Sequence, residues 1–244
     1  MDVLGIDIGG TGIKGAPVNT QTGELLTERY RLLTPQPSTP KAVAETLHQV
    51  VQFFDWCGPI GVGFPAVVRN GVTLSAANVD DGWIGTDAST LFEKTTGNPV
   101  RVVNDADAAG LAEMRFGSGL DQNGLVLIVT IGTGLGTALF INGQLVPNTE
   151  FGHIEIGGKD AELKASDTAR IREDLSWKKW AKRFNRYLQT LEKLLSPDVI
   201  ILGGGAAKKA DKFLPYLNVQ AKLMLASMLN EAGIVGAALA AERS

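Results

Sequence analysis

Cysteine and histidine are scarce in this sequence, and their scarcity excludes several kinds of site. The 244 residues include one cysteine, Cys57, and two histidines. A single cysteine cannot form a disulfide within the chain or a cysteine-based zinc site. Its apolar and aromatic neighbours predict that it is buried, and such sparing use of cysteine suits the reducing cytoplasm.

The sequence also lacks a strong excess of charge and any long hydrophobic run. The formal net charge is −3, so no broad positive field attracts nucleic acid or an anionic membrane. No apolar run approaches the ~20 residues of a membrane span, and the first residues lack the pattern of a secretion signal. We expect a cytoplasmic protein that binds neither nucleic acid nor membrane, and any polyanion must meet a local basic patch.

Glycine, in contrast, is abundant, and two glycine-rich turns share one design. The turns are Gly9-Gly10-Thr11-Gly12, after Ile6-Asp7-Ile8, and Gly132-Thr133-Gly134, after Val129-Thr130-Ile131. Each half reads strand, Gly/Thr turn, strand, turn and strand. Backbone N–H groups and threonine hydroxyls in such turns bind anions. One such turn alone is as typical of an ordinary hairpin, but the pair predicts two phosphate cradles and a phosphoryl-transfer enzyme.

The remaining pattern alternates helices with strands and predicts two closely joined α/β domains. Helices are predicted over 42–54 and 86–95 and strands over 60–65 and 100–103. Further along, the pattern predicts helix over 167–195, a strand over 198–202 that ends in a glycine turn, and helices to the end. The stretch 70–85 is polar and is expected to form loops beside a site.

Asn104 and Asp105 lie where the strand at 100–103 meets the next helix. Transfer of a phosphoryl group to an alcohol needs a base near the hydroxyl, a phosphate cradle and, usually, Mg²⁺. We expect Asp105 to be that base, held ionised by the helix N-terminus. The alternative role for Asp105 is a helix cap. Asp107 is the competing carboxylate, for which we expect a cap or an exposed position.

Glu150 and His153 lie in one predicted turn, where both can hydrogen-bond neighbouring hydroxyls of one sugar ring. A zinc site is rejected here because further histidine or cysteine ligands are missing. The segment 177–186 gathers five basic residues, and Lys208 and Lys209 follow the Gly203-Gly204-Gly205 turn. This segment is either a solvated helix face above buried aromatic residues or a basic track for an extended anionic chain. The residues proposed for the track are Lys178, Lys179, Lys182, Arg183, Lys208 and Lys209.

Four motifs, in order along the chain, resemble those of the ROK sugar kinases. They are Asp7-Ile8-Gly9-Gly10-Thr11, Asn104-Asp105-Ala106-Asp107, Ile131-Gly132-Thr133-Gly134 and Glu150-Phe151-Gly152-His153. Within that family the sequence is most similar to the polyphosphate-dependent glucokinases. The resemblance implies an α/β, actin-like (ribonuclease H-like) fold of two domains with a substrate cleft between them. It implies boundaries at 1–110 and 111–230, with a last helix at 231–244 that returns to the first domain.

The resemblance also implies an activity and a set of roles. The implied reaction phosphorylates glucose at its 6-hydroxyl with inorganic polyphosphate, ATP being a second possible donor, in a homodimer with Mg²⁺ and without zinc. Asp105 is implied as the base, and Asp7 as the residue near Mg²⁺. Sugar contacts are implied for Gly63, Pro65, Asn104, Glu150, His153 and Glu162, with Glu155 as the rival to Glu162. Phosphate contacts are implied for Asp7, Gly9, Gly10, Thr11, Gly12, Lys14, Gly132, Thr133, Gly134 and Gly204.

The sequence departs from the family pattern at two points, and three alternative functions are considered. The zinc-binding cysteine cluster of many members is absent from 157–167, and the common Pro-Gly of the sugar wall is Pro65-Ala66, whose methyl is expected to narrow that wall. An enzyme that uses ATP alone, with Gly203-Gly204-Gly205 facing adenosine, remains the main alternative. A sugar-sensing repressor module is disfavoured because strand residues begin at Val3. A dinucleotide site is disfavoured by the glycine spacing.

Overall fold

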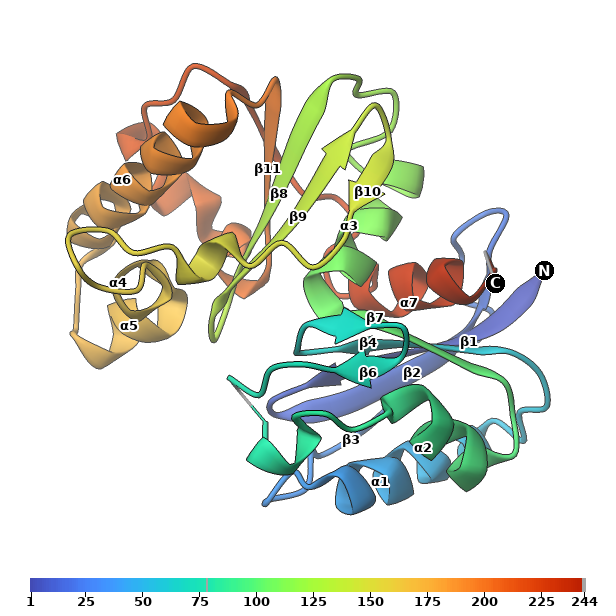
Figure 1. Ribbon diagram of the computed structural model, residues 1–244. Coiled ribbons are helices and arrows are strands. Elements are labelled where there is room, and N and C mark those ends of the chain that lie inside the picture. Colours follow the sequence, from blue (N-terminus) through green and yellow to red (C-terminus); the bar gives the residue numbers. More distant parts are fainter. Residues whose placement is uncertain (78, 243–244) are drawn as a thin grey trace. The chain divides into compact units, whose positions relative to one another are not determined.

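The computed structural model describes residues 1–77 and 79–242, which divide into two compact units (Figure 1). Unit 1 comprises Met1–Ala112 and the segment that begins at Glu231, and unit 2 comprises Glu113–Asn230. Among the described residues, no helix combines the length and apolar character needed to cross a bilayer. Each unit is built on its own five-stranded sheet.

The sheet of unit 1 has the order β3-β2-β1-β4-β7. Its strands are β1 (Asp2–Gly9), β2 (Gly12–Asn19), β3 (Tyr30–Leu32), β4 (Ile60–Phe64) and β7 (Val100–Asn104). The first three are antiparallel neighbours, whereas β1, β4 and β7 run parallel. Parallel strands end at the same edge of a sheet, so residues near the C-terminal ends of β1, β4 and β7 lie side by side.

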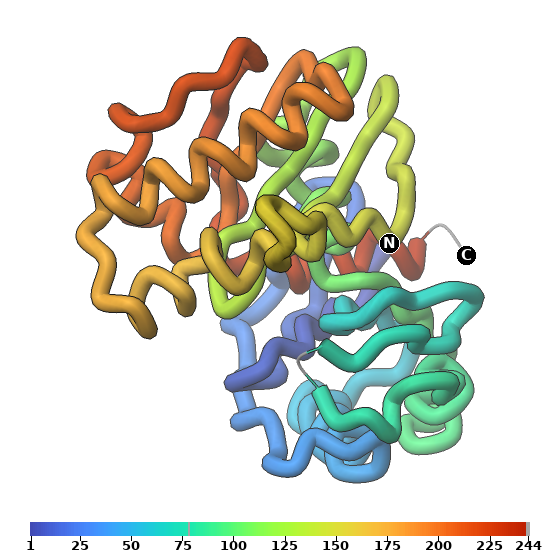
Figure 2. The backbone as a smooth tube through the Cα atoms, turned by 60° about the vertical axis from the view of Figure 1, so that its left-hand side comes forward, coloured from blue at the N-terminus to red at the C-terminus, as the bar shows by residue number. Residues whose placement is uncertain are grey.

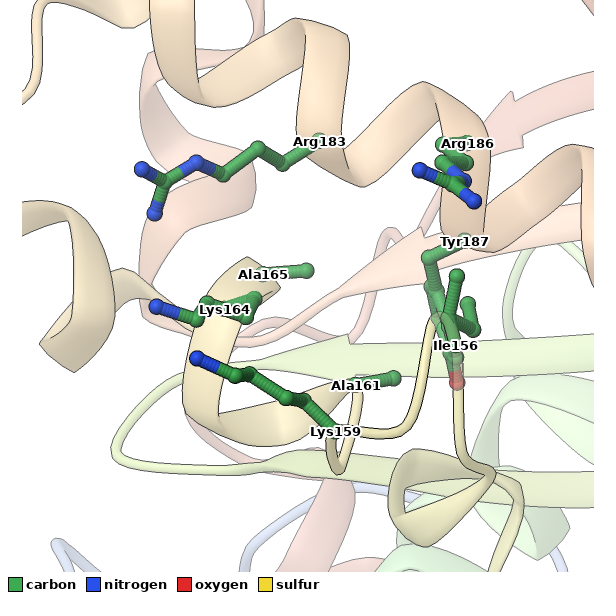
Figure 3. A pocket seen from close by; sticks show the side chains of 8 residues that line it. All are labelled: Ile156, Lys159, Ala161, Lys164, Ala165, Arg183, Arg186 and Tyr187. Atoms are coloured by element: carbon green, nitrogen blue, oxygen red, sulfur yellow. The ribbon is translucent and has the colours of Figure 1, made fainter.

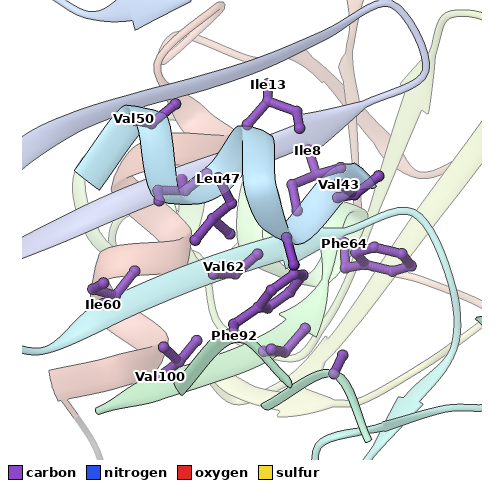
Figure 4. Packing of buried hydrophobic residues seen from close by; sticks show 14 of the residues in the cluster. Ile8, Ile13, Val43, Leu47, Val50, Ile60, Val62, Phe64, Phe92 and Val100 are labelled. Carbon is purple, nitrogen blue, oxygen red and sulfur yellow. The ribbon is translucent and has the colours of Figure 1, made fainter. Parts of the chain in front are cut away.

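One face of this sheet packs on α1 (Pro40–Phe53) and α2 (Ala88–Thr96), as Figure 4 shows. Thr39 caps α1 by accepting a hydrogen bond from the Ala42 amide at 3.4 Å, and Pro40 occupies the first turn. Asp87 caps α2 at its start, and Gly97 ends it in the left-handed conformation. The buried residues beneath the two helices include Ile6, Ile8, Leu47, Val62 and Phe92.

The opposite face of the sheet packs on α7 (Ala232–Glu242), the segment that follows unit 2 in the sequence. Side chains alternate between the faces of a strand, so Gly5 and Gly61 face α7 while Ile6 and Val62 face α1. A Cβ atom at Gly5 or Gly61 would collide with backbone atoms of α7. These two glycines therefore let α7 lie directly on the sheet. The unit is completed by η1 (Asp81–Trp83) and by the hairpin of β5 (Val68–Arg69) and β6 (Val72–Thr73).

The sheet of unit 2 has the order β10-β9-β8-β11-β12 and repeats the hairpin design of unit 1. Its strands are β8 (Leu125–Ile131), β9 (Leu135–Ile141), β10 (Gln144–Val146), β11 (Val199–Gly203) and β12 (Lys222–Leu225). The helical segments are α3 (Asp105–Phe116, which begins in unit 1), η2 (Phe151–His153), α4 (Glu162–Ala165), α5 (Asp167–Arg172), α6 (Trp177–Leu195), η3 (Gly205–Lys212) and η4 (Leu214–Tyr216).

An aromatic cluster anchors α6 in the core of unit 2. Trp180 stacks on Phe184 with ring centroids 5.0 Å apart and meets Phe213, which lies between η3 and η4, edge to face at 5.2 Å. The Trp180 indole N–H donates to the carbonyl of Ala165 at 3.0 Å, which satisfies its one polar atom. Helix α4 lies beside both α5 and α6 (Figures 1 and 2).

The two predicted hairpins, the helices near 42–54 and 86–95 and the strand before Asp105 are confirmed by the structure. Four expectations are wrong in detail. The third strand of unit 1 begins only at Tyr30, after a single bridge between Val18 and Leu25. The helix predicted over 167–195 is two helices, because Asp174 has φ 46° and Ser176 starts α6 as its N-cap.

The other two wrong expectations concern β12 and Cys57. The segment 222–225 was expected to be helical but pairs with β11 as a parallel edge strand. Cys57 is exposed, because the chain turns at Asp55 after α1 and Trp56 packs inward in its place, donating its indole N–H to the Pro59 carbonyl at 3.1 Å. Asn78, in the loop predicted over 70–85, lies outside the described residues.

Candidate active site

The parallel strands of unit 1 bring the predicted acidic residues to one edge of the sheet. Asp7 near the end of β1 pairs in register with Gly63 of β4, and Asn104 at the end of β7 pairs with Phe64. Gly63 lies so close to the start of α3 that a Cβ on it would be 3.6 Å from the Asp105 Cα. Asp7, Gly63, Asn104 and Asp105 therefore lie along one edge of the sheet of unit 1.

Asn104 is the cap of α3. Its Oδ1 accepts hydrogen bonds from the amides of Ala106 at 2.9 Å and Asp107 at 3.0 Å, and its Nδ2 donates to the Ala66 carbonyl at 3.1 Å. The predicted sugar ligand thus also fixes the start of α3 and ties it to the loop after β4. Pro65 lies in that loop, while Ala66 is 5% exposed and packs in the core of unit 1.

Asp105 occupies the first position of α3, where the positive end of the helix dipole favours its ionised form. Its Oδ1 accepts a hydrogen bond from the Ala106 amide at 2.8 Å, and the residue is half-buried. The capping alternative for Asp105 is less apt, since Asn104 supplies the cap. Asp107 is 2% exposed, so the expectation of a solvated position for it is wrong.

The first glycine turn, Gly9-Gly10-Thr11-Gly12, joins β1 to β2 and is held from β3 and the loop that follows it. Thr34 donates its hydroxyl to the Gly9 carbonyl at 2.5 Å, and Arg31 donates to the Thr11 carbonyl at 3.0 Å. A Cβ at Gly12 would lie 2.6 Å from the Arg31 Nε, so glycine at this position makes room for the guanidinium. The turn is a fixed loop with a cation beside it, which suits an anionic ligand.

Lys14 places a second cation at this edge. Its Nζ lies 3.2 Å from the Asp7 carboxylate, and both side chains are less than one-third exposed. Lys14 and Arg31 are cross-strand neighbours in the β2–β3 register. Two positive side chains, Lys14 and Arg31, therefore flank the predicted phosphate turn. The sequence singled out only Lys14.

The second glycine turn, Gly132-Thr133-Gly134, joins β8 to β9 in unit 2. Its Gly132 amide donates to the Gly134 carbonyl at 3.0 Å. Glu162 accepts a hydrogen bond from the Leu135 amide at 2.8 Å, directly after the turn. Gly204, with φ 80°, packs so tightly on the Ile131 backbone that a Cβ would clash there. The predicted phosphate glycines of unit 2 are thus brought together at the ends of β8 and β11.

Glu150, His153 and Glu162 gather close to this turn. His153 Nδ1 lies 2.8 Å from Asp160 Oδ2, and its Nε2 lies 3.9 Å from Glu150 Oε2. Burial raises the pKa of Glu150, an effect that the nearby His153 opposes and Glu162 reinforces. Burial alone would lower the pKa of His153, but the Asp160 hydrogen bond and the charges of Glu162, Asp160 and Glu150 outweigh it and raise that pKa.

Asp160 is a neighbour of His153 that the sequence did not single out. It orients the His153 ring and accepts a hydrogen bond from the Glu162 amide at 2.8 Å, and its backbone pairs with that of Glu155 in an isolated β-bridge. These contacts hold the loop that follows His153. Glu155 itself is exposed, whereas Glu162 interacts with both Glu150 and His153, so the geometry favours Glu162 over its rival. In the part of the chain that the structure describes, no three His, Cys, Asp or Glu side chains are grouped to hold a metal ion.

The predicted basic track is divided in the structure. Three of its members are exposed on α6, namely Lys178, Lys179 and Lys182. Arg183 instead pairs with Glu173 at 2.7 Å, and Lys208 on η3 donates to Asn230 at 2.9 Å. Lys209 is exposed on the same segment. The aromatic residues Trp180 and Phe184 are buried beneath α6, as the solvated-face interpretation expects.

This chain is similar to polyphosphate glucokinases and to an inorganic polyphosphate/ATP-glucomannokinase. Polyphosphate glucokinase of Mycobacterium tuberculosis is 51% identical over 97% of this chain and 90% of its own length. The same enzyme of Mycobacterium leprae is 48% identical over 97% of this chain and 74% of its own length. The crystal structure of an inorganic polyphosphate/ATP-glucomannokinase from Arthrobacter sp. strain KM has a TM-score of 0.96 at 49% identity and covers 100% of this chain and 99% of its own.

The fold is shared more widely. A ROK family glucokinase from Streptomyces griseus, solved with glucose and AMPPNP, has a TM-score of 0.85 at 24% identity, with each chain covered to 100%. The two-unit α/β architecture is thus the actin-like fold of these sugar kinases. The family profile described as "ROK family" matches residues 3–164. From the profile, the identities and the fold together, the chain belongs to the ROK family.

Proposed function

We propose that this protein transfers the terminal phosphoryl group of inorganic polyphosphate to the 6-hydroxyl of glucose. The observation that carries this proposal is the 51% identity, over 97% of the chain, to a polyphosphate glucokinase. The position of Asp105 at the start of α3 supports the same chemistry. ATP as a second donor is supported by the likeness to a polyphosphate/ATP-glucomannokinase, whose name also makes mannose a substrate to test.

In this mechanism Asp105 is the general base. The glucose oxygen attacks the terminal phosphorus, the bridging P–O bond breaks, and a polyphosphate chain shorter by one phosphate leaves. Asp105 accepts the proton of the attacking hydroxyl, and a base in this role contributes roughly 10²- to 10⁴-fold to the rate. Asn104 caps α3 and thereby holds the Asp105 backbone in place. Its Nδ2 group donates one hydrogen to the Ala66 carbonyl, and we assign the other to the sugar.

We assign the sugar and phosphate contacts as follows. In unit 1 we assign sugar contacts to Gly63 and Pro65. In unit 2 we assign them to Glu150, His153 and Glu162, and Asp160 orients His153. The two glycine turns and Gly204 hold phosphate oxygens, with Lys14 and Arg31 adding positive charge beside the first turn. Preorganised donors of this kind stabilise the charge that develops in the transition state.

Magnesium fits the donor set near Asp7. Mg²⁺ is usually held by one or two carboxylates together with waters and substrate phosphates, so a single half-buried carboxylate beside a phosphate turn is sufficient. Asp7 would hold the ion, which neutralises charge on the phosphate oxygens when bound. Lys14, paired with Asp7 at 3.2 Å, keeps that carboxylate in place.

We also propose a cytoplasmic homodimer without bound zinc. The family resemblance supports the dimer, and the scarcity of cysteine supports the compartment. Light scattering on the purified chain after size-exclusion chromatography measures the oligomeric state directly. Metal analysis of the same sample tests for zinc.

The deciding experiment measures glucose 6-phosphate formation by purified protein with glucose and Mg²⁺, supplied with either nucleotide-free polyphosphate or ATP. We expect product from polyphosphate, and loss of about 10²-fold or more in kcat in Asp105→Asn. Product from ATP alone would replace the proposal with an ATP-dependent glucokinase. A wild-type protein that makes no product from either donor would remove glucose phosphorylation and leave the sugar-sensing alternative.

A further inference from the structure

Unit 2 contains a basic pocket to which no role has been given above. The cavity has a volume of about 240 Å³. It is lined by Ile156, Lys159, Ala161, Lys164, Ala165, Arg183, Arg186 and Tyr187 (Figure 3). Half of these residues are cationic and none is acidic. Figure 3 shows the charged ends of Lys159, Lys164 and Arg183 extending toward the same side, with Arg186 on the other side of the pocket.

The positive charge of this pocket is only partly neutralised. Glu173 accepts from Arg183 at 2.7 Å and from Lys164 at 3.4 Å, and it also contacts Arg172 at 3.4 Å. One carboxylate therefore serves three cations. Within residues 1–77 and 79–242, Lys159 and Arg186 form no ion pair with an acidic side chain, and both are exposed. A concave surface with unneutralised cations attracts an anion even though the whole protein is acidic.

The pocket adjoins the second glycine turn through α4. At one end of this short helix, Glu162 accepts from the amide of Leu135, the residue that follows the turn. Lys164 and Ala165, from the same turn of helix, line the pocket. The Thr168 amide, at the start of α5, also donates to the Gly132 carbonyl at 3.4 Å. Lys164 of the pocket therefore lies within one helical turn of Glu162, the residue that contacts the second glycine turn.

The chemistry of the lining favours a chain of phosphates over a nucleotide base. Lysine binds phosphate as a point charge and arginine binds it through two parallel N–H groups. The pocket offers both kinds of cation from separate segments, α6, α4 and the preceding loop, which suits a ligand with charge repeated along its length. The one aromatic residue of the lining, Tyr187, is 1% exposed and has no face free for a base to stack on.

We propose that this pocket binds internal phosphates of a long polyphosphate donor while its terminal phosphate is transferred elsewhere. The inference rests on the proposed function and names residues outside the earlier track, namely Lys159, Lys164 and Arg186. Arg183 and Arg186 also lie beyond residues 3–164, the part that matches the ROK profile. The pocket should accordingly set the preference for chain length, not the ability to transfer phosphate.

The test compares Lys159→Gln/Arg186→Gln with wild type, using long-chain polyphosphate, tripolyphosphate and ATP as separate donors. Lys41→Gln/Lys193→Gln is the matched control, since it removes the same charge from two exposed sites outside the pocket. We expect KM for the long chain to rise by about tenfold in the pocket variant, which corresponds to the loss of one to two charge-assisted contacts. The kcat with each donor and KM for tripolyphosphate should stay within about twofold, and the control should match wild type.

A second variant is expected to strengthen the binding of long-chain polyphosphate instead of weakening it. Glu173→Gln removes the carboxylate that occupies Arg183 and Lys164, so long-chain polyphosphate should bind more tightly in a direct titration of the protein. Lys159→Gln/Arg186→Lys should bind long-chain polyphosphate with most of the wild-type affinity, because lysine restores the positive charge at position 186.

The inference and the proposed function fail differently. If wild type makes no glucose 6-phosphate from polyphosphate, the proposed function is wrong. If wild type does so but KM for the long chain is unchanged in Lys159→Gln/Arg186→Gln, the pocket has no part in donor binding. An equal rise in KM for tripolyphosphate and for the long chain would show that the pocket binds a single phosphate. An equal rise in KM in Lys41→Gln/Lys193→Gln would show that the effect comes from the net charge of the protein and not from the pocket. A circular-dichroism melt of each variant confirms that it is folded.

Discussion

His153 is the residue whose charge is most closely tied to its neighbours. Its pKa is raised above the ordinary value of 6.5 because the Asp160 hydrogen bond and three carboxylates outweigh burial. A raised folded-state pKa contributes stability that is fully present below the unfolded value and is lost as pH rises through the folded value. The stability contributed by the His153–Asp160 pair should therefore be largest in mild acid.

Asp160→Asn tests this pH dependence. The asparagine oxygen still accepts from the Glu162 amide, so that hydrogen bond contributes equally at every pH. We expect the loss in unfolding free energy to be larger at about pH 6 than at about pH 9, measured by urea denaturation at both values. A loss in unfolding free energy that is equal at both pH values, or larger at about pH 9, would show that the contact with Asp160 does not stabilise the protonated form of His153.

Gly12 and Arg31 form the second residue-scale case. In Gly12→Ala the new methyl displaces the guanidinium, whose Nε would lie 2.6 Å away, and removes its contact with Thr11. We expect KM for the donor to rise by about three- to tenfold in either Gly12→Ala or Arg31→Ala. The double variant should be no worse than either single one, because both changes remove one interaction. Additive losses in the cycle would instead give Gly12 a role of its own.

At the scale of the element, α3 depends on a cap that is also part of the predicted site. Asn104→Ala removes the Oδ1 that accepts from Ala106 and Asp107, and loss of such a cap costs about 1 kcal/mol. Asn104→Asp keeps the cap but loses the donation to the Ala66 carbonyl. We expect urea denaturation to place Asn104→Asp nearer to wild type in stability than Asn104→Ala. Equal stability of the two variants would contradict the capping role.

Elements with a strong local pattern were the ones that the sequence predicted. The hairpins around Gly9 and Gly132 combine β-branched strands with turn glycines, and the start of α3 follows a strand directly, so nearby residues fix each of them. By contrast, β12 has only four residues, and its pairing with β11 comes from tertiary contact. The break before α6 depends on Ser176 and the positive φ of Asp174, which hydrophobic spacing does not reveal.

The site was predictable to a similar extent and for similar reasons. Motif residues such as Asp105, Glu150 and His153 carry a recognisable local pattern. Asp160 and Arg31 carry none, since their contacts arise from a loop return and from strand pairing. The basic pocket was found only in part, because Lys159 and Lys164 precede the charged segment that drew attention to α6.

For the whole molecule, the two units differ in how they are assembled from the chain. Unit 2 is one continuous segment, Glu113–Asn230, with its own sheet and aromatic core. Unit 1 needs the distant α7, in which Ile234 is buried against the sheet and Gly236 against α3. We expect a fragment spanning 113–230 to fold alone, and a fragment spanning 1–112 to fold only when a peptide of 231–244 is added. Circular dichroism and cooperative melting of the fragments measure both outcomes, and a cooperatively folded 1–112 fragment on its own would refute the dependence on α7.

The path of α7 has a consequence for synthesis on the ribosome. The strands of unit 1 emerge first, yet the helix that covers one face of their sheet is translated only after all of unit 2. During that interval the glycine-lined face of β1 and β4 is uncovered and open to chaperones. A nascent chain interrupted before Glu231 would keep that face bare, which gives protein quality control a feature that distinguishes unfinished copies from complete ones.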